Sequence, residues 1–236
     1  MTVRWAYAFI DRPYGRFGAA CDFWARVTGT RRSELRGDRG QFATLVPYAG
    51  EGDPCVKVQG VADGPGGAHL DLAVDDVPGE SARACALGAR PVFSEDGLAV
   101  LRSPGGHLFC LVSWLGERVV PAGTERAGRL DQVCLDTAPG VYAAEVDFWA
   151  ALTGWPEEPC VSPEFRLLKA SPVQLLLQRL DTEGPPSAHL DLACAEPSRV
   201  REWHLAAGAE LVRVGRFWSV MRDPSGGLYC LTDRMP

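Results

Sequence analysis

Two histidines occupy the same position in a repeated hexapeptide. Residues 68–73 and 188–193 both read AHLDLA, so His69 and His189 lie 120 residues apart and each precedes an aspartate by two residues. In a β-strand, residues two apart point to the same face, and such an aspartate can orient an imidazole or hold one tautomer. A repeated structural hydrogen bond would give the same pattern. The two histidines are therefore candidates both for ligand binding and for a structural role.

Two cysteines repeat with the same spacing. Cys110 and Cys230 lie at the centre of the tripeptides FCL and YCL, near the end of each copy of the repeat. A thiol ligates a metal or attacks a substrate only after it loses its proton, and burial in an apolar strand opposes that loss. The eight cysteines include no C-x-x-C pair, and in an apolar strand a cysteine acts as a small hydrophobic residue. We therefore expect reduced, buried thiols.

Aromatic residues fall into two groups. Trp24 and Trp149 each belong to the tripeptide DFW in a segment with helical periodicity, which predicts that they anchor the core. A second group lies in segments that we expect to be strands, where alternate residues can point towards a ligand and stack on a flat organic molecule. This group contains Trp5, Tyr7, Phe42, Phe165 and Trp218.

The remaining polar candidates have simpler interpretations. His107 lies in a turn, and His204 lies on the last expected helix, where we predict a surface or rim position. Arg102 and Arg222 share one repeat position beside a turn, and surface salt bridging is the expected role of such residues. The sequence contains no G-x-S-x-G, Walker or dinucleotide-binding motif. No catalytic residue is assigned.

The repeat covers most of the chain. Besides the hexapeptide, residues 101–111 match 221–231 and residues 86–89 match 206–209 at a spacing of 120, whereas DFW repeats at a spacing of 125. The change of spacing indicates a five-residue deletion in the second copy, between Gly154 and His189. The predicted domains are residues 1–115 and 128–236, joined by a polar linker at 116–127.

Within each copy the periodicity alternates between that of strands and that of helices. In the second copy a strand follows Arg129, and a helix over 141–153 ends at Gly154. Two strands over 164–170 and 173–178 predict a hairpin, and a strand over 189–194 precedes a helix over 197–207. The copy closes with a hairpin of residues 217–222 and 227–232 across the turn DPSG. The first copy gives the same order.

Composition excludes several function classes. The chain has 236 residues, 46% of them hydrophobic and 23% charged, which is ordinary for a folded protein. The net charge of −6, with no run of lysine or arginine, argues against nucleic acid and anionic membrane as partners. No segment approaches the roughly 20 apolar residues that a membrane span needs, and the N-terminus lacks a secretory leader pattern. We expect a cytoplasmic protein, a monomer or homodimer, whose partner is a small molecule.

The order of these elements and motifs resembles the vicinal oxygen chelate superfamily, which includes glyoxalases, extradiol dioxygenases and bleomycin-resistance proteins. The resemblance rests on the helix ending in TG, the strand beginning HLDL, the helix ending in A-x-GA and the closing hairpin with its FCL or YCL strand. It implies an α+β fold of two tandem βαβββ modules, whose curled mixed sheets surround a cup and carry their helices on the outside. The subgroup that it resembles is the glyoxalase-like one.

The resemblance also implies where a metal would bind. Enzymes of the superfamily hold a divalent ion with ligands on the first strand, in some subgroups on the strand that begins HLDL here, and on the last strand, where the ligand is a glutamate. At these positions the second copy has Gln132, His189 and Cys230, and the first copy has Tyr7, His69 and Cys110. A thiol in place of the glutamate is a poor substitute in an Fe(II) or Ni(II) site. Neither copy keeps the complete metal triad.

We therefore expect a protein that binds a small aromatic or antibiotic-like organic molecule in the cup, with no cofactor. The alternative is a metal-dependent lyase, isomerase or extradiol-type dioxygenase with an altered ligand set of Gln132, His189 and Cys230 around Fe, Ni, Mn or Zn. A purely structural or regulatory role is a third possibility. The residues expected to bind the ligand are His69, His189, Tyr7, Gln132, Trp218, Phe42 and Phe165.

Overall fold

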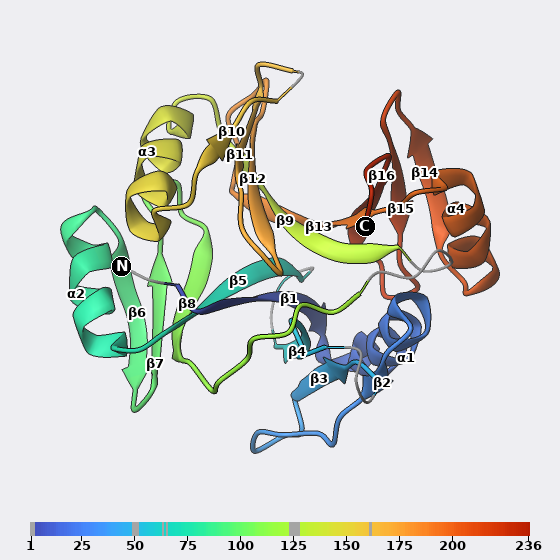
Figure 1. Cartoon of the computed structure of the whole chain (residues 1–236), viewed down its shortest axis with the longest axis horizontal. Helices are drawn as coiled ribbons and strands as arrows, with labels where there is room; N and C mark the ends of the chain where they lie inside the picture. Colours follow the sequence, from blue (N-terminus) through green and yellow to red (C-terminus); the bar gives the residue numbers. More distant parts are fainter. Residues whose placement is uncertain (1–2, 49–51, 63, 65, 123–127, 161) are drawn as a thin grey trace. The chain divides into compact units, whose positions relative to one another are not determined.

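The computed structural model describes residues 3–48, 52–62, 64, 66–122, 128–160 and 162–236. The α+β class is confirmed: the described residues form four α-helices, one short 3-10 helix and two eight-stranded mixed sheets (Figure 1). None of the helices among these residues is long and apolar enough to cross a membrane. Residues 123–127 of the expected linker lie outside the described residues.

The first copy contains ten regular elements besides its 3-10 helix. In chain order they are β1 (Trp5–Pro13), η1 (Tyr14–Arg16), α1 (Phe17–Thr28), β2 (Arg31–Arg32), β3 (Phe42–Val46), β4 (Val56–Val61), β5 (Gly67–Val74), α2 (Val77–Ala86), β6 (Arg90–Glu95), β7 (Leu98–Arg102) and β8 (Leu108–Ser113).

The second copy repeats this order. Its elements are β9 (Arg129–Thr137), α3 (Tyr142–Thr153), β10 (Glu157–Glu158), β11 (Phe165–Leu168), β12 (Gln174–Arg179), β13 (Ser187–Ala193), α4 (Pro197–Ala206), β14 (Glu210–Val214), β15 (Trp218–Arg222) and β16 (Leu228–Thr232).

The expected βαβββ order is present, and it occurs twice in each copy. The predicted strands and helices of the second copy are all found, with boundaries within a few residues. The sequence did not reveal β14 or its counterpart β6, because every residue of both strands is exposed. Without one buried face, a strand shows no alternation of apolar and polar residues. Each of these strands also carries an irregularity of register against its neighbour, between Pro91 and Phe93 and between Leu211 and Arg213.

Both sheets have the same topology. The strand orders are β2-β3-β4-β1-β5-β8-β7-β6 and β10-β11-β12-β9-β13-β16-β15-β14. The strand that begins HLDL pairs in parallel with the last strand of its copy, whereas the hairpin strands pair antiparallel. The AHLDLA strand and the FCL or YCL strand are therefore direct neighbours in each copy.

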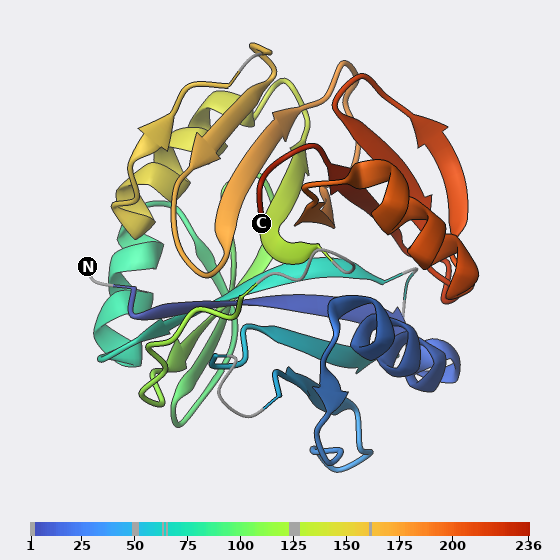
Figure 2. The same ribbon diagram turned by 45° about the vertical axis from the view of Figure 1, so that its right-hand side comes forward.

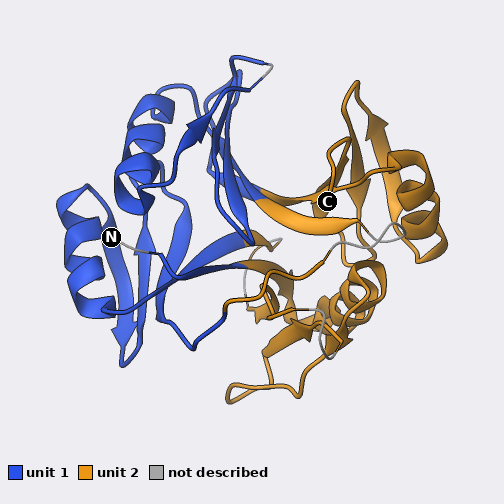
Figure 3. Ribbon diagram, in the orientation of Figure 1, with its two compact units in different colours: residues 1–7, 69–117, 133–188 blue, residues 8–68, 118–132, 189–236 orange. Residues whose placement is uncertain are grey.

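The compact units of the chain do not coincide with the two copies of the repeat (Figure 3). Unit 1 consists of residues 1–7, 69–117 and 133–188, and unit 2 of residues 8–68, 118–132 and 189–236. Each unit thus combines half of the first copy with half of the second. The predicted module boundaries describe the repeat in the sequence and stay a prediction.

In unit 1, α2 lies beside α3, as Figures 1 and 2 both show. The Arg83 guanidinium, on α2, donates a hydrogen bond of 2.9 Å to the carbonyl of Leu152 at the end of α3. This cation therefore occupies the negative end of the α3 dipole. Between the two halves of the unit, Phe109 packs edge-on against Trp149, with ring centroids 4.9 Å apart. Trp149 is 1% exposed, which confirms its expected place in the core.

A buried carboxylate joins the two halves of unit 1. Glu145 accepts hydrogen bonds from the indole Nε1 of Trp149 at 2.7 Å and from the backbone N–H of Gly105 at 2.6 Å. Burial raises the pKa of Glu145, against the opposing effect of hydrogen bonds that include one from Ser103. Helix α3 is thereby tied to the closing turn of the first copy.

Unit 2 makes the equivalent connection with a different carboxylate. Asp223, in the closing turn of the second copy, accepts hydrogen bonds at one oxygen from Arg12 Nε, Arg12 Nη2 and Trp24 Nε1, at 2.9, 2.6 and 3.0 Å. Its other oxygen accepts the backbone N–H groups of Ser225 and Gly227. Trp24 and Arg12 are 0% and 1% exposed. The buried carboxylate is therefore on a helix in unit 1 and in a turn in unit 2.

The two units also differ at the residue that follows the closing turn, which is His107 in unit 1 and Gly227 in unit 2. His107 of unit 1 makes a 3.1 Å hydrogen bond between its Nε2 and Thr137 Oγ1. In unit 2 the residues at the two equivalent positions are Gly227 and Arg12, and a Cβ added to Gly227 would lie 1.9 Å from Arg12 Nη2. Glycine is required there because the guanidinium fills the space of the missing side chain.

The Arg12–Asp223 pair provides a test of the packing of unit 2. Replacing Arg12 with methionine leaves the Asp223 carboxylate buried without its cation, and we expect the free energy of unfolding to fall by about 3 to 5 kcal/mol. The double variant Arg12→Met/Asp223→Asn should regain part of that loss. Urea unfolding of Arg12→Met, Asp223→Asn and the double variant measures the coupling.

The exposed pair of Arg4 and Asp75 is the matched control, because its side chains are 43% and 53% exposed. Arg4→Met should cost less than about 1 kcal/mol. Strictly additive losses for Arg12 and Asp223 would contradict the view that their charges depend on each other.

The lowered pKa of buried His107 predicts that the protein loses stability in acid. Burial lowers the pKa of His107 to about 4, from 6.5 in the unfolded chain, so the folded protein binds this proton less readily than the unfolded chain does. The contribution of neutral His107 to the free energy of unfolding is therefore complete above pH 6.5. It is lost as the pH falls from 6.5 to 4, by up to about 3 kcal/mol. Urea unfolding across this range should show a steeper decline for the wild type than for His107→Gln; parallel curves would refute the assignment.

Candidate functional site

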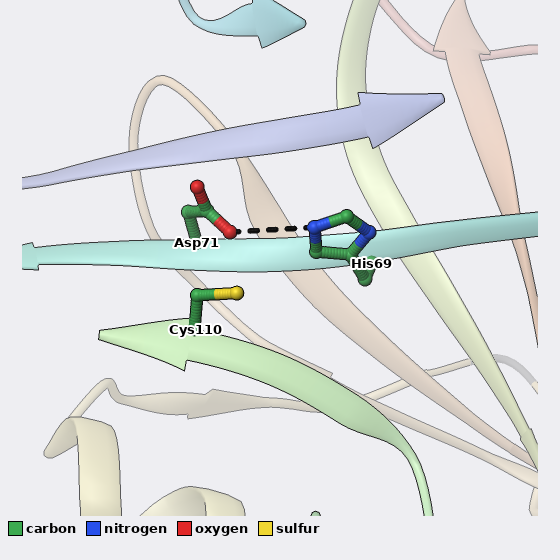
Figure 4. A group of neighbouring side chains, drawn as sticks. All are labelled: His69, Asp71 and Cys110. Atoms are coloured by element: carbon green, nitrogen blue, oxygen red, sulfur yellow. Dashed lines mark ion pairs between the residues drawn. The ribbon is translucent and has the colours of Figure 1, made fainter. Parts of the chain in front are cut away.

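The first candidate cluster lies on β5 and β8. His69 and Asp71 are two residues apart on β5 and so point to the same face. The parallel register places Asp71 directly beside Cys110 of β8. All three residues belong to unit 1, and Figure 4 shows their side chains turned towards one another. Each histidine lies next to the aspartate that follows it by two residues, on the face that the spacing predicts.

The donor atoms of this cluster converge. His69 Nε2 lies 3.4 Å from Asp71 Oδ1, and the side chains are 12% and 5% exposed. One nitrogen of His69, one oxygen of Asp71 and the sulfur of Cys110 all lie within 4.8 Å of one another. Asp71 Oδ1 is buried and accepts no hydrogen bond from the residues that the structure describes. An oxygen in this position is suited to accept a proton or to contact a cation.

The thiol of this cluster is protonated at neutral pH. Burial raises the pKa of Cys110 to about 11, the negative charge of Asp71 adds to the increase, and His69 opposes it. A neutral thiol is a poor nucleophile and has to lose its proton before it can ligate a metal. The cluster in its metal-free form therefore offers an imidazole and a carboxylate as its polar groups.

The second copy contains a closely related cluster in unit 2. His189 Nε2 lies 3.4 Å from Asp191 Oδ1, with side chains 19% and 5% exposed, and Asp191 pairs in register with Cys230 of β16. Burial raises the pKa of Asp191 and that of Cys230. Asp191 Oδ1, like that of Asp71, accepts no hydrogen bond from a described residue.

The two clusters differ in the charges around them. Burial raises the pKa of Asp191, the charges of His189 and Arg234 lower it, and the negative charge of Asp131 raises it. Arg234 is held by two hydrogen bonds to the carboxylate of Asp131, at 2.8 and 3.0 Å. At the equivalent position the first copy has Trp114 instead of an arginine. The second cluster therefore lies beside an Arg234–Asp131 ion pair that the first copy does not have.

The first-strand candidates are both buried. Tyr7 is 2% exposed, and its hydroxyl donates a hydrogen bond to the carboxylate of Glu117, which lies just after β8. Gln132 is 4% exposed. The contact with Glu117 was not foreseen, because the segment after β8 was interpreted only as a linker.

The aromatic candidates are half-buried residues on strands. Phe42 lies on β3, Phe165 on β11 and Trp218 on β15, as expected, and Phe165 belongs to unit 1 whereas the other two belong to unit 2. Trp5 differs from them, because it is only 4% exposed. A role of these residues in ligand binding stays a prediction.

The prediction for His204 was wrong, because this residue is fully buried and not at the surface. Its Nδ1 makes a 2.8 Å hydrogen bond with the hydroxyl of Tyr229, and its ring packs edge-on against Phe23. The buried residues of α4 are Val200 and His204, so the sequence showed no apolar stripe that would have identified the buried face of this helix. The two arginines beside the closing turns, Arg102 and Arg222, are exposed as expected.

Comparison with known proteins identifies the family. A model of the glyoxalase-like domain matches the chain twice, at residues 8–112 and 132–232. The chain belongs to the glyoxalase-like domain family. The two successive matches confirm the tandem glyoxalase-like modules, and with them the membership of the vicinal oxygen chelate superfamily. No curated protein matches the sequence.

Solved structures share the fold at low sequence identity. The Mn(II)-bound glyoxalase from Novosphingobium aromaticivorans is 19% identical, with a TM-score of 0.69 over 96% of this chain and 80% of that one. A mutant of 4-hydroxymandelate synthase from Streptomyces coelicolor is 17% identical, with a TM-score of 0.64 over 100% and 94%. The 2,3-dioxygenase LapB from Pseudomonas sp. KL28 is 14% identical, with a TM-score of 0.67 over 98% and 92%. At these identities the likeness establishes the fold and no more.

The ligand set implied by the resemblance does not fit an Mn(II) or Fe(II) ion in this glyoxalase-like chain. The last strand offers the thiol of Cys230, whose pKa is raised by burial, and thiolate is a soft ligand. The buried carboxylate of the second cluster comes instead from Asp191, on the neighbouring strand β13. The metal-ligand set of Gln132, His189 and Cys230 therefore lacks the hard oxygen of a glutamate.

The reactivity of Cys110 tests the electrostatics of the first cluster. In chelator-treated protein, alkylation of this thiol by iodoacetamide should be slow at neutral pH and accelerate as the pH approaches about 11. Asp71→Asn removes a negative charge that raises the pKa of Cys110, so alkylation at pH 8 should be up to about tenfold faster. Mass spectrometry of the cysteine-containing peptides gives the rate.

Asp191→Asn is the matched control, since it removes the equivalent carboxylate from the other cluster. It should accelerate the alkylation of Cys230 and leave that of Cys110 unchanged. Rapid alkylation of Cys110 in the wild type at pH 7 would show that the thiol is not in the environment described above.

Proposed function

We propose that this protein binds a small organic molecule at its glyoxalase-like modules, in the cup that the superfamily resemblance implies. The observation that carries the proposal is the repeated cluster of histidine, aspartate and neutral thiol. His69 and His189 are partly exposed and stand beside buried carboxylates, so each imidazole can exchange a hydrogen bond with a ligand. Neither cluster presents an activated nucleophile, because both thiols are buried and have raised pKa values.

The half-buried aromatic residues support a ligand with a flat apolar part. Phe42, Phe165 and Trp218 keep part of their surface accessible on strands of the two sheets. Aromatic side chains in such positions contribute large apolar contact areas to a ligand, and ring stacking adds about 0.5 to 1.5 kcal/mol to each contact. An aromatic or antibiotic-like molecule with one or more hydroxyl groups fits both features.

One observation favours an enzyme as the second candidate. The donor atoms of the first cluster lie within 4.8 Å of one another, which is a spacing from which side chains can close around a metal ion. Solved structures with this fold include the dioxygenase LapB and a Mn(II)-bound glyoxalase. A lyase, isomerase or dioxygenase with an altered ligand set is therefore the alternative to a binding protein.

The cellular setting is part of the proposal. The eight cysteines are all free thiols, which is typical of proteins in a reducing compartment. We infer a cytoplasmic protein that acts as a monomer or homodimer on a small molecule.

Titration with catechol and with bleomycin tests the proposed function. The tryptophan fluorescence of chelator-treated protein should be quenched when one of these probes binds, and the probe should remain unconverted. His189→Gln and His69→Gln remove the imidazoles, and the affected site should bind about tenfold more weakly, as expected for the loss of one ligand hydrogen bond of about 1.4 kcal/mol.

Arg199→Ala serves as the control, because the side chain of Arg199 is 51% exposed and pairs with exposed Glu196 at the start of α4. It should bind the probes as the wild type does. Binding that requires an added metal, or ring cleavage of catechol after addition of Fe(II), would replace the binding protein with the enzyme.

A further inference from the structure

We propose that His69, Asp71 and Cys110 form a site for one borderline divalent cation, of the Zn²⁺ or Co²⁺ type. The site draws its ligands from two neighbouring strands, β5 and β8, of unit 1. It differs from the ligand set that the resemblance implies, because it uses the aspartate of HLDL and no residue of the first strand. A fourth coordination position stays open for water or a ligand.

The geometry of the three donors supports this site. Tetrahedral zinc takes bonds of about 2.0 Å to nitrogen and oxygen and about 2.3 Å to sulfur, which corresponds to donor separations of roughly 3.3 to 3.8 Å. His69 Nε2 and Asp71 Oδ1 already lie 3.4 Å apart, and all three donors lie within 4.8 Å of one another. Side-chain rotations that move the donors by about an ångström therefore complete the site.

The buried oxygen of Asp71 is an independent observation. Asp71 is 4% exposed, and its Oδ1 accepts no hydrogen bond from a described residue while facing the imidazole of His69. A buried carboxylate oxygen in this state costs free energy unless a proton or a cation neutralises it. A cation between Asp71 and Cys110 would satisfy this oxygen.

The chemistry of the donors selects the kind of cation. One nitrogen, one oxygen and one sulfur suit a borderline ion, whereas Mg²⁺, Ca²⁺ and Mn²⁺ prefer sites made of oxygen. On binding, the Cys110 thiol forms a metal–sulfur bond and its proton passes to solvent. With neutral His69, ionised Asp71 and the thiolate, the two negative charges of the ligands balance the charge of the ion.

The second cluster is a natural comparison within the same chain. His189, Asp191 and Cys230 repeat the residue types, but among the described residues the sulfur of Cys230 does not join donors of His189 and Asp191 in a group within 4.8 Å, as the sulfur of Cys110 does with His69 and Asp71. We therefore expect the cation at the first cluster and not at the set that contains Cys230.

This inference goes beyond the proposed function, and the two can fail separately. The cation is measured without any organic ligand, whereas the catechol and bleomycin titrations use chelator-treated protein. Loss of metal binding would leave the binding of organic molecules unaffected, and the converse also holds.

Loading of the tag-free 236-residue chain with metal tests the site. After chelation and dialysis against Zn²⁺, elemental analysis should give one equivalent per chain, and binding at pH 7 should release about one proton because the thiol is protonated beforehand. Loading with Co²⁺ should give a thiolate-to-cobalt charge-transfer absorption. Cys110→Ser should abolish this absorption, and Asp71→Asn should weaken binding at least about tenfold.

The equivalent thiol of the second cluster supplies the matched control: Cys230→Ser should keep both the zinc equivalent and the cobalt absorption. In the wild type, Zn²⁺ should also protect Cys110 from alkylation, a measurement that does not depend on whether a variant folds. Absence of bound zinc, or a cobalt absorption that survives Cys110→Ser, would overturn the proposal.

Discussion

Parallel pairing of the strand that begins HLDL with the last strand of its copy is the constraint on which the candidate sites depend. In both copies this pairing places the aspartate opposite the cysteine, as Asp71 beside Cys110 and Asp191 beside Cys230. Because residues two apart share a face, the histidine then lies over the same pair. A shift of one residue in either register would move the thiol to the other face of the sheet and would dissolve the cluster. The register of these two strands thus determines which side chains meet in each candidate cluster.

The two copies share the histidine–aspartate–cysteine cluster, but the two units differ in the contacts that join their halves. Each unit ties the tryptophan of a DFW helix to a closing turn through one buried carboxylate, but Glu145 supplies it in unit 1 and Asp223 in unit 2. Arg12 neutralises Asp223, whereas none of the described residues places an equivalent cation beside Glu145, whose pKa is raised by burial. Where the first copy has His107, the second has Gly227, and the Arg12 guanidinium occupies the space that a side chain there would fill.

Much of the fold could be predicted from the sequence, because its strongest signals are local. The 120-residue repeat, the helices that end at Gly29 and Gly154, and the hairpin across DPSG are all visible as patterns of neighbouring residues. The edge strands β6 and β14 were missed because their residues are all exposed and carry no alternation. The burial of His204 and the mixing of the two copies in each unit were also missed, since both follow from packing between segments far apart in the chain.

The composition of the candidate site could be predicted only in part, for the same reason. His69, His189, Cys110 and Cys230 could be selected from their spacing, and the aspartates were expected to act only on the histidines. That each aspartate also faces a thiol follows from strand pairing, which no local pattern contains.

This contact changes what the substitution of cysteine for glutamate means. A thiol taken alone is the loss of a hard metal ligand, but a thiol beside a buried carboxylate and an imidazole is a different set of donors, suited to a softer ion. The replacement therefore need not end metal binding in this fold; it changes which ion the fold can hold, and at Cys110 of the first copy the three donors lie within 4.8 Å of one another.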